Sequence, residues 1–458
     1  MTGSSALMAI AHIFLCYVLF LSFNKPFGHG APLVKSKPHA TPSLCSGPEH
    51  GLRVVHKYAP CTPLGRKKSA SSQILAEDER RVQVRYTGIY NRRPVWGKGE
   101  PERDPDVLKG SIGAGNYLVQ VRFGTPLQTF NLTLDTGSYK TWVRCQPPTM
   151  SPCPKQQNAS LYYPSCSSTY SNATCSTPPC NNHDEENYMD NSGITGTYVA
   201  DTLRIEDGDE YEIPKFVFLC VYHEKGEFED ANGILGLGLS GTSHGNYALT
   251  TQTAAMFHKV FCHCLPTSAN SDGYVYFGEE AREKCPFSGS YTPLLSSPSG
   301  HDPSFYYVNL ISITIGQKRV NISSSVSSPR TILDSGTVIT RLPSSVYSVL
   351  RSEFRGLMSE YPPVSTTPSH DNVLDTCYNL KEYNNPVIPK MVLHFENLDL
   401  DLDQTAVTWT ADDTSQVCFA FAESKEDGLT IIGNHQQQKR NILYNVPEQR
   451  VEIGHDNC

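Results

Sequence analysis

Apolar and polar residues alternate in short segments along most of the chain after residue 113, which is the pattern of half-buried β-strands. Turn residues such as Gly, Pro and Asn separate these segments. Strands are predicted at 115–122, 130–135, 274–277, 305–310 and 391–395. A helix is predicted at 344–354, directly after Leu342-Pro343. The pattern therefore indicates an all-β fold with few short helices.

The first 110 residues do not follow this alternation. Residues 6–23 form the one long apolar run of the chain, and its place at the N-terminus favours a signal peptide, 1–23. A retained signal anchor is the alternative, because 18 apolar residues are just enough to span a bilayer. We prefer removal, after which no membrane span is expected.

Residues 24–110 differ from the rest of the chain in charge. Between 24 and 110 there are 16 Lys and Arg against 8 Asp and Glu, whereas the whole chain has a net charge of −8 and the remainder −16. A basic leader on an acidic body suits either a nucleic-acid arm or an inhibitory propeptide. The body has no basic cluster and segment 76–85 resembles a helix, so we expect a propeptide and no nucleic-acid partner.

An internal repeat organises the body of the chain. Asp135-Thr-Gly-Ser returns as Asp334-Ser-Gly-Thr, 199 residues later, and an apolar strand precedes each copy. An apolar pair followed by Gly comes about 100 residues after each motif, ending at Gly236 and at Gly433. Two such matches in the same order predict two duplicated lobes.

The two aspartates of this repeat carry the candidate chemistry. An Asp before Gly often does no more than close an Asx turn, but two matched copies argue for a functional carboxylate. If the lobes meet about a pseudo-twofold axis, Asp135 and Asp334 face each other and share one proton. One can then deprotonate a water while the other protonates a peptide carbonyl. The residues that would support this pair are Thr136, Gly137, Ser138, Ser335, Gly336 and Thr337.

Other sites have weaker support in the sequence. The 12 cysteines from Cys145 onward suit disulfides in an oxidising compartment, and their spacing does not suit zinc. Segment 145–185 is rich in Cys, Pro and Ser and is expected to be an insertion held by disulfides. We expect no metal and no cofactor. Glycans are expected at four sequons, Asn131, Asn158, Asn172 and Asn321.

These motifs together resemble the pepsin-type aspartic proteases, and specifically the plant branch that includes nepenthesin and the CND41-like enzymes. The resemblance extends over about residues 50–458. The segments that carry it include 54–64, 115–117, 135–138, 233–238, 264–266, 334–343, 374–378, 417–422 and 431–438. It implies a bilobal fold with lobes at 111–295 and 296–458.

The resemblance also implies a hairpin flap over the cleft. Tyr188 matches the flap tyrosine, and Trp142 matches the tryptophan that orients it. This chain departs from the family pattern at Met189 and Asn191, which replace two flap glycines, and we expect a stiffer or differently shaped flap. Lys140 is a second departure, and it is expected to bring a cation near the rim of the aspartate pair.

Disulfides are implied by the same resemblance. Cys377 would pair with Cys418 inside the second lobe, and Cys264 with the last residue, Cys458. The cysteines from Cys145 to Cys220 would mostly hold the insertion, and Cys262 and Cys285 could pair with each other.

The function expected from the sequence is an aspartic endopeptidase, made as a secreted zymogen. It would act on polypeptides, bind its own propeptide and work as a monomer in the apoplast or vacuole. A plastid location is less favoured, because the N-terminus is apolar rather than rich in Ser and Arg. The alternative is an inactive binding protein such as the plant xylanase inhibitors and seed globulins. Relatives of that kind typically lack one aspartate motif or its flanking Ser or Thr, and this chain has both motifs.

Overall fold

In the computed structural model of the protein, all described residues lie within one compact unit, Pro42–Cys458. The described ranges are 51–60, 62, 71–90, 116–147, 153–155, 157–158, 160–173, 183–187, 193–207, 209–225, 231–240, 247–268, 270–285, 289–298, 301–322, 331–364, 373–410, 416–424 and 429–454. The predicted signal peptide, 1–23, lies outside them. None of the described helices is long and apolar enough to cross a membrane.

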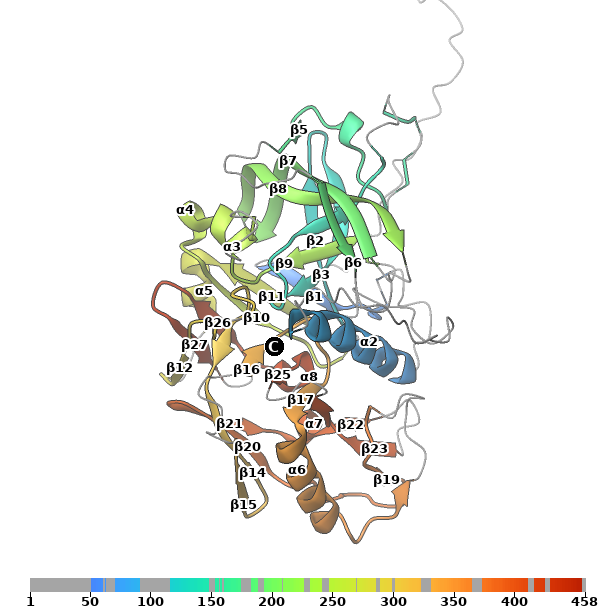
Figure 1. Ribbon diagram of the computed structural model, residues 1–458, viewed down its shortest axis with the longest axis vertical. Helices are drawn as coiled ribbons and strands as arrows, with labels where there is room; N and C mark the ends of the chain where they lie inside the picture. Colours follow the sequence, from blue (N-terminus) through green and yellow to red (C-terminus); the bar gives the residue numbers. More distant parts are fainter. Residues whose placement is uncertain are drawn as a thin grey trace, which may run out of the picture. The chain divides into compact units, whose positions relative to one another are not determined.

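Strands dominate the structure, as the alternating pattern predicts (Figure 1). The largest sheet has 14 strands and runs in the order β12-β27-β26-β10-β11-β1-β2-β3-β9-β4-β8-β7-β5, with β6 paired to β7. Its strands are β1 (Leu52–His56), β2 (Tyr117–Phe123), β3 (Gln128–Asp135), β4 (Trp142–Arg144), β5 (Ser171–Asn172), β6 (His183–Asn187), β7 (Gly193–Asp207), β8 (Asp209–Lys225), β9 (Gly233–Gly236), β10 (Val260–Cys264), β11 (Asp272–Phe277), β12 (Tyr291–Pro293), β26 (Ile442–Asn445) and β27 (Arg450–Ile453). This sheet therefore combines strands from residues 52–293 with β26 and β27 near the C-terminus.

Three smaller sheets build the second half. They run β13-β16-β25-β17-β24, β15-β14-β20-β21 and β18-β19-β23-β22. Their strands are β13 (Tyr307–Val308), β14 (Leu310–Ile315), β15 (Lys318–Asn321), β16 (Thr331–Leu333), β17 (Thr340–Pro343), β18 (Pro363–Val364), β19 (Cys377–Asn379), β20 (Met391–Phe395), β21 (Leu398–Leu402), β22 (Thr408–Thr410), β23 (Gln416–Phe419), β24 (Phe421–Ser424) and β25 (Thr430–Ile432). The helices are α2 (Ser71–Tyr90), α3 (Leu249–Gln252), α4 (Ala254–Phe257), α5 (Gly278–Lys284), α6 (Ser344–Leu357), α7 (Gln404–Val407) and α8 (Asn434–Gln437), with a 3-10 turn at Pro164–Cys166.

The predicted duplication is present in the strand connections. In the first half β3 pairs in parallel with β9, β9 antiparallel with β4, and β4 in parallel with β8. In the second half β16, β25, β17 and β24 repeat the same three pairings in the same order. Asp135 is the last residue of β3 and Asp334 directly follows β16, so the two aspartates have equivalent positions in the two halves.

The leader contributes two elements to this body, and the sequence predicts only one of them. The helix expected at 76–85 is α2, which extends over Ser71–Tyr90. Strand β1, Leu52–His56, was missed. It pairs antiparallel with both β2 and β11, so the leader is a structural part of the large sheet.

The described disulfides are Cys145–Cys220, Cys153–Cys166, Cys262–Cys285 and Cys377–Cys418. Cys153–Cys166 lies inside the predicted insertion, whereas Cys145–Cys220 joins the residue after β4 to the interior of β8. Cys264 is also disulfide-bonded, while its expected partner, Cys458, lies outside the described residues.

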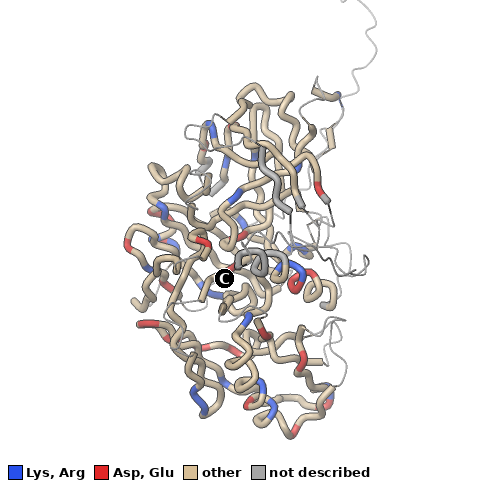
Figure 2. Tube along the Cα trace, viewed as in Figure 1, with Lys and Arg blue, Asp and Glu red and all other residues tan. Residues whose placement is uncertain are grey.

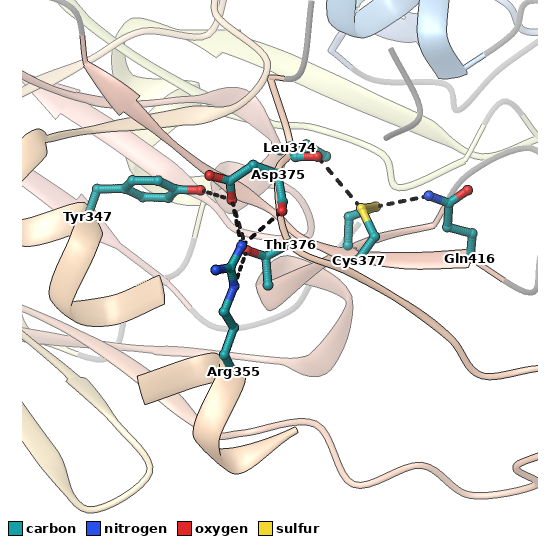
Figure 3. Close-up of a disulfide and its surroundings, with 8 residues drawn as sticks. Tyr347, Arg355, Leu374, Asp375, Thr376, Cys377 and Gln416 are labelled. Atoms are coloured by element: carbon teal, nitrogen blue, oxygen red, sulfur yellow. Dashed lines mark hydrogen bonds and ion pairs between the residues drawn. A yellow bond between two sulfur atoms is a disulfide. The ribbon is translucent and has the colours of Figure 1, made fainter. Parts of the chain in front are cut away.

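The disulfide Cys377–Cys418 lies beside a segment of the second half, Asp375 and Thr376, that is held by several hydrogen bonds (Figure 3). Next to it, Asp375 accepts a hydrogen bond from the Tyr347 hydroxyl over 2.7 Å. Arg355 donates to the backbone oxygen of Asp375 over 3.2 Å and to the Thr376 hydroxyl over 3.1 Å. Tyr347 and Arg355 belong to α6, so this helix fixes the segment that precedes β19.

Candidate active site

Each motif aspartate is buried and accepts hydrogen bonds from its own turn. The Gly137 N–H donates to Asp135 Oδ1 over 2.9 Å, and the Gly336 N–H donates to Asp334 Oδ1 over 2.8 Å. The hydroxyls of Ser138 and Thr337 donate to the second oxygen of each carboxylate. These donors fix both carboxylates in matching orientations, and they explain why Gly and a hydroxyl residue follow each Asp.

A reciprocal set of hydrogen bonds joins the two motifs. The Thr136 N–H donates to Ser335 Oγ over 3.0 Å, and the Ser335 N–H donates to Thr136 Oγ1 over 2.9 Å. Each hydroxyl then donates to a backbone oxygen of the opposite half, Leu333 for Thr136 and Leu134 for Ser335. The residues between Asp and Gly therefore hold the two aspartates together.

Glycine is required in both motifs because the opposite carboxylate is so close. A Cβ on Gly137 would lie 2.5 Å from Asp334 Oδ1. A Cβ on Gly336 would lie 2.5 Å from Asp135 Oδ1. Both distances are shorter than any normal carbon–oxygen contact, so a side chain at either position would push the two motifs apart.

Arg81 of the leader lies between the two carboxylates. Its Nη2 atom is 3.0 and 3.1 Å from the two oxygens of Asp135, and 3.2 and 3.4 Å from those of Asp334. The Arg81 side chain is only 2% exposed. One guanidinium nitrogen thus contacts all four carboxylate oxygens and offsets the repulsion between the two aspartates. It also fills the space between them.

The rest of α2 is anchored in the second half of the body. Asp78, one turn before Arg81, accepts hydrogen bonds from the Val338 N–H over 2.6 Å and the Ile339 N–H over 3.1 Å. Its other strong contact is an ion pair with Arg341 at 2.7 Å. Figure 2 shows the run of acidic residues, followed by basic ones, along this part of α2.

Apolar contacts of the same helix face reinforce this docking. Ile74 and Leu75 are buried in a cluster with residues of the second half, which are Val338, Ile339, Val373, Leu374, Cys377, Cys418 and Ala422. Val82 is buried in a second cluster with Phe305, Tyr307, Ile332, Leu429 and Ile431. These leader residues share a face with Asp78 and Arg81 because helix positions three or four apart lie side by side.

The leader also holds its own two elements together. Lys57, directly after β1, forms a buried ion pair with Glu77 of α2, with an N–O distance of 2.8 Å. Burial and, to a smaller extent, the positive charge of Lys57 together lower the pKa of the neighbouring His56 to about 4. Burial raises the pKa of Asp78, although Arg341 and the two backbone N–H groups oppose that rise.

The flap expected around Tyr188 is described only in part. Strands β6 and β7 form an antiparallel hairpin in which Asn187 pairs with Gly193. Tyr188, Met189 and Asn191 lie between these two strands in the sequence and are outside the described residues. Trp142 is buried against Ile194 of this hairpin, in a cluster that also contains Tyr198 and Ile234.

Several other predicted positions can be placed. Lys140 is buried, and its ammonium lies 5.7 Å from the centre of the Tyr139 ring, so the expectation of a cation at the rim of the aspartate pair stays a prediction. Asn158, Asn172 and Asn321 are exposed. Asn131 is partly buried, and its side-chain oxygen accepts a hydrogen bond from Gln120 over 3.2 Å.

Three residues of the site were not singled out by the sequence analysis: Arg81, Asp78 and Arg341. The basic leader and its predicted helix were the available signals, but a charge count does not identify which of the leader's arginines reaches the aspartates. Arg341 stands seven residues after Asp334, as Trp142 stands seven residues after Asp135. This equal spacing of seven residues can be read from the sequence, but only the fold shows that the two residues occupy equivalent positions.

The chain matches two family models, described as xylanase inhibitor N-terminal, over residues 117–279, and xylanase inhibitor C-terminal, over residues 305–454. It is 32% identical to an aspartyl protease family protein of Arabidopsis thaliana, covering 89% of this chain and 87% of that protein. It is 28% identical to aspartic proteinase nepenthesin-1 of Nepenthes gracilis, covering 76% and 79%.

Among solved structures, conglutin gamma, a basic 7S globulin from lupine seeds, is similar with a TM-score of 0.59. The two are 18% identical, and the match covers 75% of this chain and 93% of that one, so it shows the fold alone. The fold, the paired Asp-x-Gly motifs and the identity over most of the chain lead to one conclusion. The chain belongs to the plant pepsin-like aspartic protease family.

Proposed function

We propose that this protein is an aspartic endopeptidase that is made as a zymogen. The observation that carries the proposal is the matched geometry of Asp135 and Asp334, each held by its own Gly N–H and hydroxyl and both linked to a single Arg81 nitrogen. Two carboxylates in that arrangement can hold one water between them once the arginine leaves.

Peptide hydrolysis would then need only the two aspartates and that water. One carboxylate takes a proton from the water while the other, protonated, donates a proton to the carbonyl oxygen of the scissile bond. The hydroxyls of Ser138 and Thr337 keep each carboxylate oriented during this exchange. A tetrahedral diol forms, and its collapse passes a proton to the leaving amine. The sequence of steps forms no covalent bond between enzyme and substrate.

The leader supports the zymogen part of the proposal. Arg81 fills the place that the water would need, and β1 and α2 hold it there through a sheet and two buried ion pairs. We infer that the chain stays inactive until this segment is displaced. The disulfides are consistent with secretion, which we propose as the route, with the apoplast or vacuole as the destination.

The second candidate is a binding protein without catalysis, which the similarity to xylanase inhibitor models favours. Both candidates share the fold, so the aspartates decide between them. Loss of one motif would support the binding protein, and both motifs with their supporting donors are present here.

The test is digestion of a denatured protein by purified full-length chain that has been incubated in acid, across pH 3 to 7. We expect acid-dependent cleavage that pepstatin blocks and that Asp135→Asn abolishes. The matched control is Asp399→Asn, since Asp399 lies on β21 and pairs with His394 rather than with the leader or the site. Absence of cleavage at every pH from a folded chain without its leader would support the binding protein instead.

A further inference from the structure

Arg341 and Trp142 occupy equivalent positions in the two halves. Trp142 lies opposite Ile234 in the antiparallel pairing of β4 with β9, and Arg341 lies opposite Ile431 in the pairing of β17 with β25. Both are buried, at 4% and 1% exposure. Trp142 is buried in a cluster with Ile194 of the flap hairpin, whereas Arg341 brings a guanidinium to the equivalent position of the second half, where it contacts Asp78.

The described carboxylates that form ion pairs with Arg341 both come from the leader. Its Nη2 is 2.7 Å from Asp78, and its Nη1 is 3.2 Å from Glu79. Its Nε atom is buried and has no acceptor among the described residues. Another acidic residue of the second half, Asp375, already accepts hydrogen bonds from Tyr347 and Arg351.

Departure of α2 therefore leaves several donors without acceptors at once. The Val338 and Ile339 N–H groups lose Asp78 together with the guanidinium. The residues that pack with α2 at this place are apolar and include Leu374 and Ala422. Buried donors and an unpaired buried charge in such surroundings cost free energy, and a carboxylate that enters from a substrate would recover it.

The spacing on α2 relates this place to the scissile bond. Asp78 and Arg81 are three residues apart in a helix, which separates them by about 5 Å along the axis. An extended peptide rises about 3.3 Å per residue, so the carboxylate would come roughly one to two residues from the bond that the aspartates attack.

We propose that Arg341 and the backbone N–H groups of Val338 and Ile339 form a substrate subsite that binds an acidic side chain, and that Asp78 occupies this subsite in the precursor. The inference rests on the proposed function, since it names a substrate preference of the same cleft. Hydrogen bonds from α6 and the disulfide Cys377–Cys418 hold the segment around Asp375 (Figure 3). We expect this segment to keep its position when the leader leaves.

The test uses the full-length chain after acid activation and a set of extended peptides. An Asp is placed in turn at each of the four positions before and after the scissile bond, and each peptide is paired with its Asn counterpart. At pH 5 a peptide Asp is ionised. We expect kcat/KM to be about 10-fold higher for Asp than for Asn at one position, because charge-assisted hydrogen bonds to Arg are strong when desolvated.

Arg341→Gln should bring this ratio close to 1, and Arg341→Lys should retain part of it, since lysine keeps the charge without the planar fork. Arg319→Gln, on exposed strand β15, is the control and should keep the full ratio. The preference should also fade below pH 4 as the peptide carboxylate is protonated. Equal rates for Asp and Asn peptides at every position, with both hydrolysed, would overturn the subsite and leave the proposed function intact.

A binding measurement tests the subsite even if no peptide is hydrolysed, which is the outcome that would overturn the proposed function. A labelled peptide of residues 71–90 is titrated into the acid-activated chain. We expect Asp78→Asn in the peptide to weaken binding at least about 10-fold to the wild-type chain and to have little effect on binding to the Arg341→Gln chain. The same loss with both chains would contradict the proposed role of Arg341.

Discussion

Arg81 Nη2 donates a hydrogen bond to Asp135 Oδ1 over 3.0 Å, although 54 residues separate them in the sequence. The same nitrogen lies 3.2 Å from Asp334 Oδ1. A water or a peptide carbonyl would need this position to react, so arginine and substrate exclude each other. The contact therefore links the leader directly to the chemistry proposed for the body.

Gly137→Ala should inactivate the activated chain. Its Cβ would lie 2.5 Å from Asp334 Oδ1, and relief of that clash must move one carboxylate by about an ångström. Misplacement of this size typically costs about 100-fold in rate. We expect kcat/KM for a denatured protein substrate to fall at least 100-fold, measured after acid incubation.

Gly356→Ala is the matched control for that variant. Gly356 lies in α6, and a Cβ there would meet no atom within 4 Å. Alanine is the better helix former, so stability should rise by about 0.5–1 kcal/mol in urea unfolding, with activity unchanged. Similar activity losses in both variants would show that the close approach at Gly137 is not what requires glycine.

His56 should make release of the leader sensitive to acid. Its pKa is about 4 in the folded chain, against about 6.5 when unfolded, and it faces Lys57, Tyr58 and Tyr117. The unfolded form binds more protons between these values, so stability is full above pH 6.5 and is lost as the pH falls towards 4. The free energy of unfolding should fall by roughly 3 kcal/mol in total over this range.

The measurement is the pH dependence of leader dissociation between pH 7 and 4. His56→Gln should flatten this dependence, because glutamine does not titrate. His223→Gln is the control, since that side chain is exposed. A pH dependence in His56→Gln as steep as in wild type would exclude this histidine as a source of acid sensitivity.

Glycan occupancy should differ among the four sequons if the chain is secreted. Asn158, Asn172 and Asn321 are exposed, whereas Asn131 is paired within β3 and its side chain contacts Gln120. We expect glycopeptide mapping of the secreted chain to find glycans at the three exposed sites and little or none at Asn131. High occupancy at Asn131 would mean that β3 and β2 tolerate displacement of that contact.

The sequence predicts well what depends on neighbouring residues. The strand around Leu132 and helix α6 follow from local periodicity, and the two halves follow from a repeated motif. Strand β1 was missed because Val54-Val55 interrupts any alternation, and the strand is held by partners far away in the sequence, β2 and β11.

The site was predictable only where the motif itself carries the chemistry. Asp135 and Asp334 stand in matching tetrapeptides, so their pairing could be expected. The contact between Asp78 and Arg341 spans 263 residues, and no local pattern connects the two. Lys140 follows the first motif closely, but the sequence does not show that its side chain is buried.

The most direct test of the account removes the arginine and the aspartate in combination. Full-length Arg81→Ala, Arg80→Ala and Arg81→Ala/Asp135→Asn chains are assayed at pH 5 without acid incubation, with a quenched peptide substrate and from the first minute. Circular dichroism establishes that each chain is folded. Arg80 is the matched control because it neighbours Arg81 on α2 and makes no described contact with either aspartate.

We predict immediate hydrolysis by Arg81→Ala, a lag or no activity for wild type and Arg80→Ala, and no hydrolysis by the double variant. That result would show that Arg81 blocks a catalytic pair that includes Asp135. Folded Arg81→Ala that stays inactive even after acid incubation, or a double variant as active as the single one, would contradict the account.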